Sequence, residues 1–242
     1  AYLVNLFNPE VVVIGGGLEE AGEEFLNRVA STVGEWAFRE MMRLEGLDAV
    51  SIAAPPVFHH AMTMAAMKAG KHVLCEKPFS TDQTKAREMW EESKRAKLTA
   101  MIAHEFRFAS ARTRVKELID DGYIGPLHMV VMTLLTGPTN AFQPGPLAER
   151  DDASQANGFL FGVGSHYIDC LRHWFGEVIS ASGQLHTHFS DRTRAGSSEI
   201  AHATADGTFS LVLQFANGGW ATMVGSREAP FGPEGRVEIY GR

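Results

Sequence analysis

The fold is decided by residues 48–78, which read DAVSIAAPPVFHHAMTMAAMKAGKHVLCEKP. The run Asp48–Ala54 is short and apolar, as is typical of a strand that is buried on both faces of a parallel sheet. The segment 60–69 is predicted to be a helix, and it ends at Gly70, a residue that suits left-handed backbone. A second strand is expected at 72–74. Strand, helix and strand in this order predict a parallel sheet with right-handed crossovers.

The same alternation continues on both sides of this stretch. An apolar run at Val11–Ile14, bounded by Pro9 and Gly15, is expected to be another buried parallel strand. The remaining elements expected in this half are helices at 18–29, at 36–44, from a cap at Ser80 or Thr81 to 96, and at 109–121, with a strand at 98–103. The first half of the chain is therefore predicted to be an α/β unit.

The pattern changes after Pro126. Strand-like runs are expected near 128–135, 178–188, 204–215, 220–226 and 236–240, with one helix from Ser165 to Phe175. The pair Asn217-Gly218 is a strong signal for a hairpin turn. A helix on an open, mainly antiparallel sheet is an α+β arrangement. The chain is therefore divided into residues 1–124 and 125–242, with a boundary near Gly125.

The open sheet predicts self-association. Leu211, Leu213 and Trp220 lie on its expected strands. A sheet that carries such residues exposes an apolar face or a bare edge unless something covers it. We therefore expect a homo-oligomer that forms through the C-terminal sheet.

Composition narrows the classes of function. The chain has 242 residues and a formal net charge of −7, and an acidic chain gains nothing from counterion release, so no nucleic-acid partner is expected. No apolar run reaches the roughly 20 residues of a membrane-spanning helix, and the first residues lack the features of a secretory signal. The two distant cysteines, Cys75 and Cys170, form no disulfide framework, which indicates the cytoplasm.

No metal site is predicted. Two cysteines that lie far apart in the sequence do not support a thiolate site. His186 and His188 alternate on an expected strand, and two histidines at this spacing can bind a metal. Because no third ligand is evident, a solvated strand face is the preferred interpretation.

Several strings in the chain are highly specific. They are PPVFH at 55–59, AGKHVLCEKP at 69–78, HEFRF at 104–108, DGYIG at 121–125, GSHYID at 164–169, ADGTF at 205–209 and VEIYG at 237–241. In this order they resemble the Gfo/Idh/MocA family of glucose–fructose oxidoreductases and inositol dehydrogenases, over roughly residues 31–242. The resemblance implies a Rossmann-like N-terminal domain and a C-terminal α/β domain whose open sheet often forms the oligomer interface. It also implies NAD- or NADP-dependent hydride transfer at a hydroxyl of a sugar, polyol or cyclitol substrate.

The resemblance implies two catalytic residues and two that bind substrate. Lys77 follows a strand end, where ligands of α/β sheets bind, and its ammonium would stabilise a developing alkoxide. His166 begins a helix and would act as general acid and base, since imidazole titrates near neutrality. Arg107 would bind a substrate hydroxyl or carboxylate, and Asp169 would bind substrate or orient His166. Each residue also has a structural alternative. Lys77 would be a solvated surface lysine and His166 a histidine of the core, while Arg107 would form a structural salt bridge and Asp169 would cap the helix.

One departure concerns this proton-transfer site. Gly162 stands four residues before His166, where many family members carry an aspartate. The glycine removes one proton-relay partner of the histidine.

Cofactor contacts are expected at the carboxyl ends of the strands. The residues expected to bind NAD or NADP are Gly15, Gly17, Pro55, His59, Glu76 and Lys77. The triplet Gly15-Gly16-Gly17 lies between a strand and a helix, as phosphate binding requires, but Glu20 stands where the dinucleotide fingerprint has its third glycine. A tight turn is therefore an alternative for the triplet, and dinucleotide binding is expected to be weak or lost.

Residues 1–29 have a second resemblance. Their NPEVVVIGGG string resembles a segment of the ROK family of repressors and sugar kinases, so the chain is interpreted as a possible fusion or fragment. Two alternatives to the oxidoreductase follow. One is a catalytically impaired sugar-binding or structural remnant of the Gfo/Idh/MocA family, and the other is a fragment of a sugar kinase.

Overall fold

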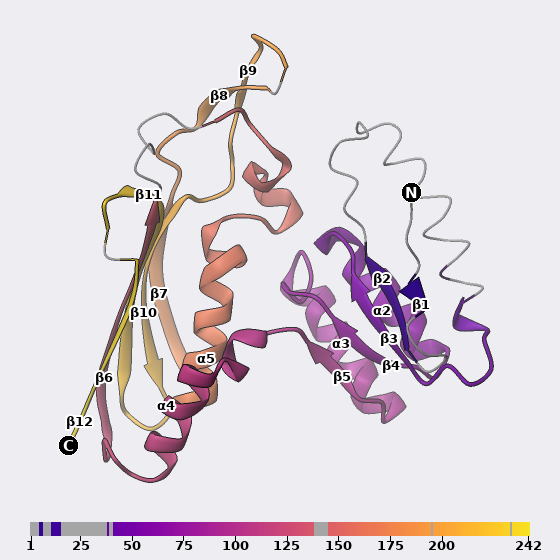
Figure 1. Ribbon diagram of the computed structural model, residues 1–242, viewed down its shortest axis with the longest axis horizontal. Coiled ribbons are helices and arrows are strands. Elements are labelled where there is room, and N and C mark those ends of the chain that lie inside the picture. Colours follow the sequence, from indigo (N-terminus) through magenta and orange to yellow (C-terminus); the bar gives the residue numbers. More distant parts are fainter. Residues whose placement is uncertain are drawn as a thin grey trace. The chain divides into compact units, whose positions relative to one another are not determined.

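The computed structural model describes residues 5–6, 11–15, 38, 41–137, 145–194, 196–232 and 234–242. The chain forms two compact units, Ala1–Ala103 (unit 1) and His104–Arg242 (unit 2), whose elements are labelled in Figure 1. The helix expected at 18–29, Gly17 and Glu20 lie outside the described residues.

Unit 1 is built on a five-stranded sheet. Its strands are β1 (Asn5–Leu6), β2 (Val11–Gly15), β3 (Ala49–Ala53), β4 (His72–Cys75) and β5 (Ala100–Ile102), in that spatial order. Strands β2 to β5 are parallel, which confirms the parallel sheet, and β1 pairs antiparallel with β2. The first apolar run therefore joins the same parallel sheet as the strand at 49–53.

Two helices connect strands β3, β4 and β5 of unit 1. Helix α2 (Pro56–Lys68) begins four residues earlier than expected, because Pro56 occupies the first helical turn, where the missing N–H costs nothing. Helix α3 (Gln83–Ala96) begins after Asp82, whose carboxylate accepts the Lys85 N–H at 2.9 Å. Neither Ser80 nor Thr81 is the cap; the Ser80 hydroxyl instead donates to the Asp82 carbonyl oxygen.

Unit 2 combines two main helices with a larger sheet. Its elements are η1 (Glu105–Phe108), α4 (Ser110–Asp120), β6 (Leu127–Gly137), η2 (Glu149–Asp151), η3 (Ala153–Gln155), the π-helix η4 (Leu160–Gly164), α5 (Ser165–Phe175), β7 (Val178–His186), β8 (Asp191–Thr193), β9 (Ile200–His202), β10 (Thr208–Phe215), β11 (Trp220–Pro230) and β12 (Gly235–Gly241). The sheet order is β12-β6-β11-β10-β7. Every neighbouring pair is antiparallel except β6 and β11, which are parallel.

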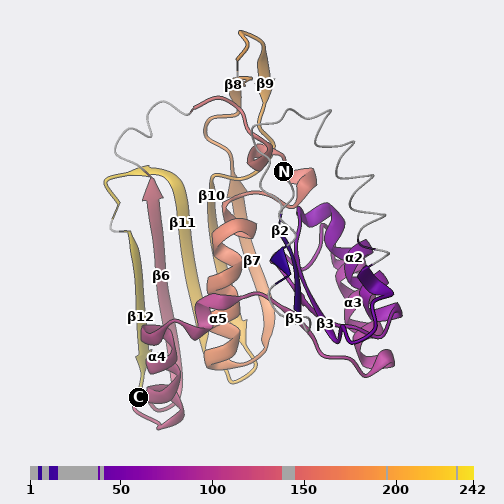
Figure 2. The same cartoon turned by 45° about the vertical axis from the view of Figure 1, so that its right-hand side comes forward.

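One face of this sheet packs against the helices. Figures 1 and 2 show α5 along that face, and the core beneath it includes Val130, Leu213 and Ala221, which lie side by side on three strands. Leu211 also packs against this core. The expectation that Leu211 and Leu213 contribute to an exposed face was therefore wrong. Alternate residues of a strand point to the same face of the sheet, so Leu211 and Leu213 lie on the same face as the buried Phe209.

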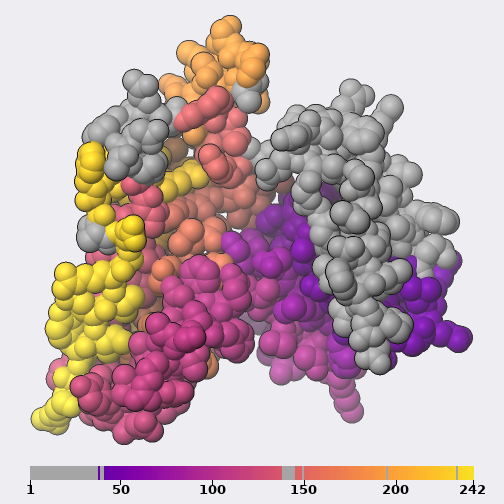
Figure 3. All heavy atoms as spheres, viewed as in Figure 1, coloured from indigo at the N-terminus to yellow at the C-terminus, as the bar shows by residue number. Residues whose placement is uncertain are grey.

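The opposite face, called the outer face here, carries exposed apolar residues. Val212, Trp220, Val224 and Tyr240 are each 41–47% exposed and come from β10, β11 and β12. The yellow atoms of β12 lie on the surface of unit 2 in Figure 3. No described helix packs on this face, as the two ribbon views show.

The division between the units lies some twenty residues before the expected boundary near Gly125. Elements η1 and α4 belong to unit 2 because they pack on α5. The Phe106 and Tyr167 rings meet edge to face at 5.6 Å, and the Trp174 indole donates to the Arg112 carbonyl oxygen at 3.3 Å. These contacts join residues about 60 positions apart, so a change of rhythm in the sequence could not reveal them.

A buried ion cluster ties the loops of unit 2 to the sheet. The Asp151 carboxylate is paired with the guanidinium groups of Arg192 on β8 and Arg227 on β11, and it accepts the Ala148 N–H at 2.9 Å. The side chain of Asp151 is 1% exposed. The Asp151 carbonyl oxygen accepts two further N–H groups, from residues 204 and 205. The small β8–β9 hairpin was not expected, and this cluster anchors it.

Candidate functional site

In unit 1, the predicted cofactor residues follow the carboxyl ends of parallel strands. Gly15 ends β2 and lies opposite Ala53 at the end of β3, while Glu76 and Lys77 follow β4. The Glu76 N–H donates to the Ile52 carbonyl oxygen at 2.8 Å, which extends the pairing of β3 and β4. The Lys77 N–H donates to the Glu76 carboxylate at 3.2 Å, and both side chains are half-buried.

His59 joins the loops that follow β3 and β4. The ring is fully buried, with Nδ1 2.8 Å from the Pro78 carbonyl oxygen and Nε2 2.7 Å from the Ala54 carbonyl oxygen. Both ring nitrogens therefore face protein oxygens. His59 positions the loops that carry Pro55 and Lys77, and a direct contact with a cofactor stays a prediction.

The strand ends of unit 1 fit a dinucleotide. Small residues, Gly15 and Ala53, stand at the ends of adjacent parallel strands, so that a ligand can approach the backbone closely. Ligands of open α/β sheets bind at this edge. Gly15, Pro55, Glu76 and Lys77 would hold the cofactor here, while Gly17 lies outside the described residues.

In unit 2, His166 lies in a cluster of aromatic and charged residues. It is the second residue of α5 and is 3% exposed. Its ring stacks on Phe106 with centroids 4.0 Å apart and planes inclined by 13°, and His104 meets it edge-on at 5.4 Å. Its Nδ1 lies 3.7 Å from the Glu105 carboxylate. The histidine is thus buried but is held in a defined orientation beside an acid.

Arg107 and Asp169 form a two-pronged ion pair. The Arg107 Nε donates to the Asp169 Oδ2 at 2.8 Å, and its second nitrogen binds the other carboxylate oxygen. Hydrogen bonding to Asp169 raises the pKa of the Arg107 guanidinium above its ordinary value, although partial burial opposes this. The pair holds η1 against α5, one turn from His166. Substrate binding by either residue stays a prediction.

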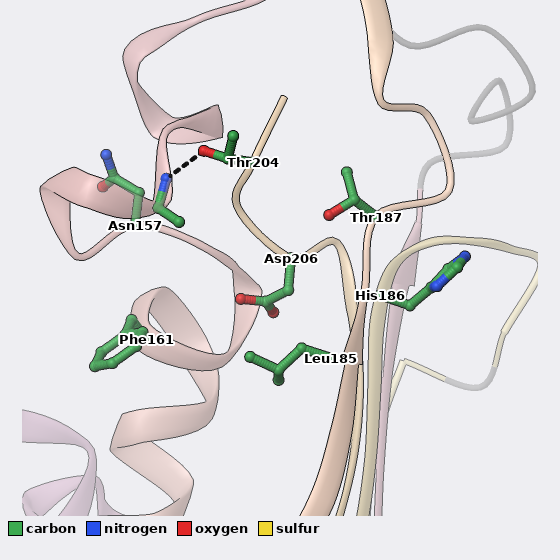
Figure 4. A pocket seen from close by; sticks show the side chains of 8 residues that line it. Asn157, Phe161, Leu185, His186, Thr187, Thr204 and Asp206 are labelled. Carbon is green, nitrogen blue, oxygen red and sulfur yellow. Dashed lines mark hydrogen bonds between the residues drawn. The ribbon is translucent and has the colours of Figure 1, made fainter. Parts of the chain in front are cut away.

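A cavity of about 230 Å³ lies beside the π-helix, and Asn157, Phe161, Leu185 and Asp206 are among the residues that line it (Figure 4). The Asp206 carboxylate points toward the helix and accepts the Leu160 N–H at 2.9 Å. Burial raises the pKa of Asp206.

Asp206 caps the π-helix that leads into the helix of His166. A Cβ at Gly158, whose φ is +124°, would collide with its carboxylate, so this turn requires glycine. Sequence reasoning missed this capping role, because the capping residue comes from the loop before β10, 46 positions away.

The remaining histidines do not form a centre. The rings of His186 and His188 lie 4.3 Å apart on the exposed end of the β7 region. In the described ranges of the chain, no three His, Cys, Asp or Glu side chains gather closely enough to hold a metal ion. None of the described helices is long and apolar enough to cross a membrane.

The structure thus brings the predicted residues together as two groups. His166, Arg107 and Asp169 lie in one cluster of unit 2, and the cofactor residues around Lys77 lie at one sheet edge of unit 1. Lys77 belongs to unit 1 and His166 to unit 2.

Comparison with known proteins identifies the family. A model described as the GFO/IDH/MocA C-terminal domain matches residues 113–242, and one described as the oxidoreductase family NAD-binding Rossmann fold matches residues 9–104. The chain belongs to the Gfo/Idh/MocA family. The match to the Rossmann-fold model begins at residue 9 and so overlaps the segment 1–29. The similarity of that segment to the ROK family stays a prediction.

Relatives in the Gfo/Idh/MocA family include dehydrogenases of sugars and cyclitols. The chain is 28% identical to the myo-inositol 2-dehydrogenase of Thermotoga maritima, covering 84% of this chain and 56% of that protein. It is 29% identical to the levoglucosan dehydrogenase of Pseudarthrobacter phenanthrenivorans, covering 81% and 53%. The chain therefore spans about half the length of these curated relatives.

Solved structures agree with this assignment. A levoglucosan dehydrogenase in complex with NADH and levoglucosan has a TM-score of 0.78 and 26% identity, covering 96% of this chain and 61% of that one. An NAD-binding oxidoreductase from Klebsiella pneumoniae has a TM-score of 0.79 and 25% identity, covering 90% and 59%. The α/β fold predicted from the sequence is confirmed, with a parallel Rossmann-like sheet followed by a mixed sheet with helices.

Proposed function

We propose that this chain acts as an NAD- or NADP-dependent oxidoreductase that removes hydride from a hydroxyl-bearing carbon of a sugar, polyol or cyclitol. The observation that carries the proposal is the position of His166. The ring is buried, stacked on Phe106 and close to the Glu105 carboxylate, so an imidazole that titrates near neutrality is held in one plane beside an acid. The similarity to inositol and levoglucosan dehydrogenases supports the substrate class.

Each residue of the proposed mechanism has a separate task. His166 accepts the proton of the substrate hydroxyl, and the ammonium of Lys77 stabilises the negative charge that develops on that oxygen. Arg107 and Asp169 keep η1 fixed against α5, so that the imidazole keeps its orientation. When bound, NAD⁺ or NADP⁺ supplies the hydride acceptor.

Site-directed variants test this function. We expect His166→Asn to lower kcat/KM for oxidation of a polyol by about 10²–10⁴-fold, the range of general acid–base catalysis, while NADH binding is kept. Lys77→Met should lower kcat in the same assay. His202→Asn is the matched control, since this histidine is 66% exposed on β9 and pairs with Asp191. Unchanged turnover by the His166 variant would refute the mechanism.

The alternative of an impaired binding protein gives a different result. In that case a panel of sugars and cyclitols shows no NAD(P)-dependent turnover. Quenching of tryptophan fluorescence by NADH then separates a chain that binds the cofactor without reacting from one that has lost the site.

We also propose that the outer face of unit 2 binds a second copy of the chain. Val212 and Trp220 are about 40% exposed on adjacent strands, and a mixed sheet with an uncovered apolar face is a typical surface for self-association. We propose the cytoplasm as the location of the chain, because Cys75 and Cys170 are both free thiols, as in a reducing compartment.

A further inference from the structure

We propose that Glu105 is the proton-relay partner of His166, carrying the proton between the buried imidazole and solvent. This inference rests on the proposed function, in which His166 is the general base. Glu105 acts through the histidine and not on the substrate.

The distance and the difference in exposure support the relay. The Glu105 Oε2 lies 3.7 Å from the His166 Nδ1. The histidine side chain is 4% exposed, whereas the glutamate side chain is 63% exposed. The solvent-exposed Glu105 carboxylate can therefore accept a proton from the ring after a small movement that brings the two groups to hydrogen-bond distance. Catalytic hydrogen bonds commonly tighten only when substrate binds.

The surrounding contacts fix which edge of the ring faces the acid. Phe106 covers one face of the imidazole, and the guanidinium of Arg112 from α4 lies over the Phe106 ring, 4.6 Å from its centroid. His104 meets the ring edge-on. The stacking on Phe106 and the edge contact with His104 thus fix the plane of the imidazole, with Nδ1 on the side of Glu105.

Other charged groups surround this pair. Arg107 and Asp169 form an ion pair, so together they carry no net charge. Arg112 carries a positive charge and would favour the neutral imidazole, while His104 is the other titratable group from the η1 segment. Glu105 is therefore the acid in this cluster that is not already held in an ion pair with an arginine.

The π-helix that leads into α5 leaves room for a carboxylate at Gly162, where the chain has no side chain. A Cβ built on Gly162 meets no heavy atom of the described chain within 4 Å. Residues four apart on a helix share one face, so an aspartate at this position would lie beside His166. The acid comes instead from η1, at Glu105.

The proton balance is complete with these two residues. The substrate hydroxyl gives its proton to one nitrogen of the neutral His166 ring, and the Nδ1 proton passes to the Glu105 carboxylate. Glu105 then releases the proton to water, which leaves the ring neutral with its remaining proton on the nitrogen that faced the substrate. After the product leaves, that nitrogen gives its proton to water and Nδ1 takes one back through Glu105, which restores the starting tautomer. In the reverse reaction the same steps deliver a proton to the alkoxide.

The first test measures the titration of His166 by NMR of its ring protons in the full chain. In Glu105→Gln the midpoint should move to lower pH by roughly half a unit, because a nearby carboxylate stabilises the imidazolium. Glu117→Gln is the matched control, an exposed glutamate on α4 that pairs with Arg114. An unmoved midpoint in the Glu105 variant overturns the relay.

The second test uses turnover and rescue. Glu105→Gln should lower kcat by about tenfold and move the acidic limb of the pH profile with little change in KM. Adding Gly162→Asp to this variant should restore kcat, which a merely structural role of Glu105 would not allow. Failure of the rescue together with an unchanged pH profile contradicts the proposal. If the unaltered chain shows no turnover, the proposed function fails, and the relay fails with it even if the NMR midpoint moves.

Discussion

Replacement of Asp151 by alanine should strongly destabilise unit 2. The carboxylate is 1% exposed and lies between Arg192 and Arg227, whose side chains are 11% and 26% exposed. Its removal leaves two guanidinium groups facing each other in a poorly solvated site. Breaking a buried ion pair from one side costs about 3–5 kcal/mol, far more than the loss of a surface pair.

Thermal unfolding measures this cost. For a unit of 139 residues (104 to 242), a loss of about 3–5 kcal/mol lowers Tm by roughly 10–20 °C. Asp191→Ala is the matched control, because that aspartate also pairs with a basic side chain, His202, but is 73% exposed. Its Tm should change by no more than about 2 °C.

The effect should also depend on pH. Burial alone would raise the pKa of Asp151, but hydrogen bonds from Arg192 and the Ala148 N–H, with the charge of Arg227, hold it below the ordinary value of 3.8. A carboxyl group with a lowered folded pKa stabilises the fold above its unfolded pKa, and this stabilisation is lost as pH falls through the folded pKa. The Tm difference between the parent and Asp151→Ala should therefore shrink below about pH 4. A variant as stable as the parent at pH 7, or a difference that grows on acidification, would refute the reasoning.

Three further predictions concern association, cofactor and thiols. Trp220→Asp on the outer face should lower the molar mass measured by light scattering toward that of the monomer. Trp90→Asp, at a 51% exposed tryptophan on α3, should leave it unchanged. A parent that is already monomeric at micromolar concentration contradicts the proposed interface. Titration calorimetry should find NADH and NADPH binding closer to millimolar than to micromolar, and a low micromolar dissociation constant for either would show that the first thirty residues complete the site. Burial raises the pKa of Cys75 and of Cys170 to about 11. Neither thiol should therefore react with a thiol reagent at pH 8 until the chain is denatured, and fast labelling of the folded chain would contradict this.

Local patterns predicted much of the fold. The helix expected from Ser165 to Phe175 has those bounds in the structure, because its apolar spacing and the glycine that follows it are both local signals. The hairpin at Asn217-Gly218 is confirmed, with Gly218 at a φ of +91°. The sequence could not show that β6 pairs parallel with β11, since strand alternation indicates which face is buried but not which strand is the neighbour.

The candidate site was predictable only in part, because local patterns do not show which distant residues meet. Family-like strings pointed to His166 and Arg107, but the partners of both residues come from other segments of the chain. Phe106 and Glu105 meet the histidine across 60 and 61 positions, and Asp169 meets Arg107 across 62. His59 was expected beside the cofactor, and its ring contacts the carbonyl oxygens of Ala54 and Pro78, which lie 5 and 19 positions from it. Residue type and spacing identify candidate groups, but only tertiary contacts reveal which atoms they face.

The place of β6 between β12 and β11 affects how unit 2 can assemble. This strand comes first in its sheet along the chain, yet its neighbours are β11 and β12, the last two. Met129 lies opposite Trp220, a separation of 91 residues. The antiparallel β7, β10 and β11 are closer in sequence, so this meander can form while β6 has no partner. Joining β6 requires a long loop to close, which makes unit 2 a slow folder whose unpaired strand is open to intermolecular pairing during synthesis.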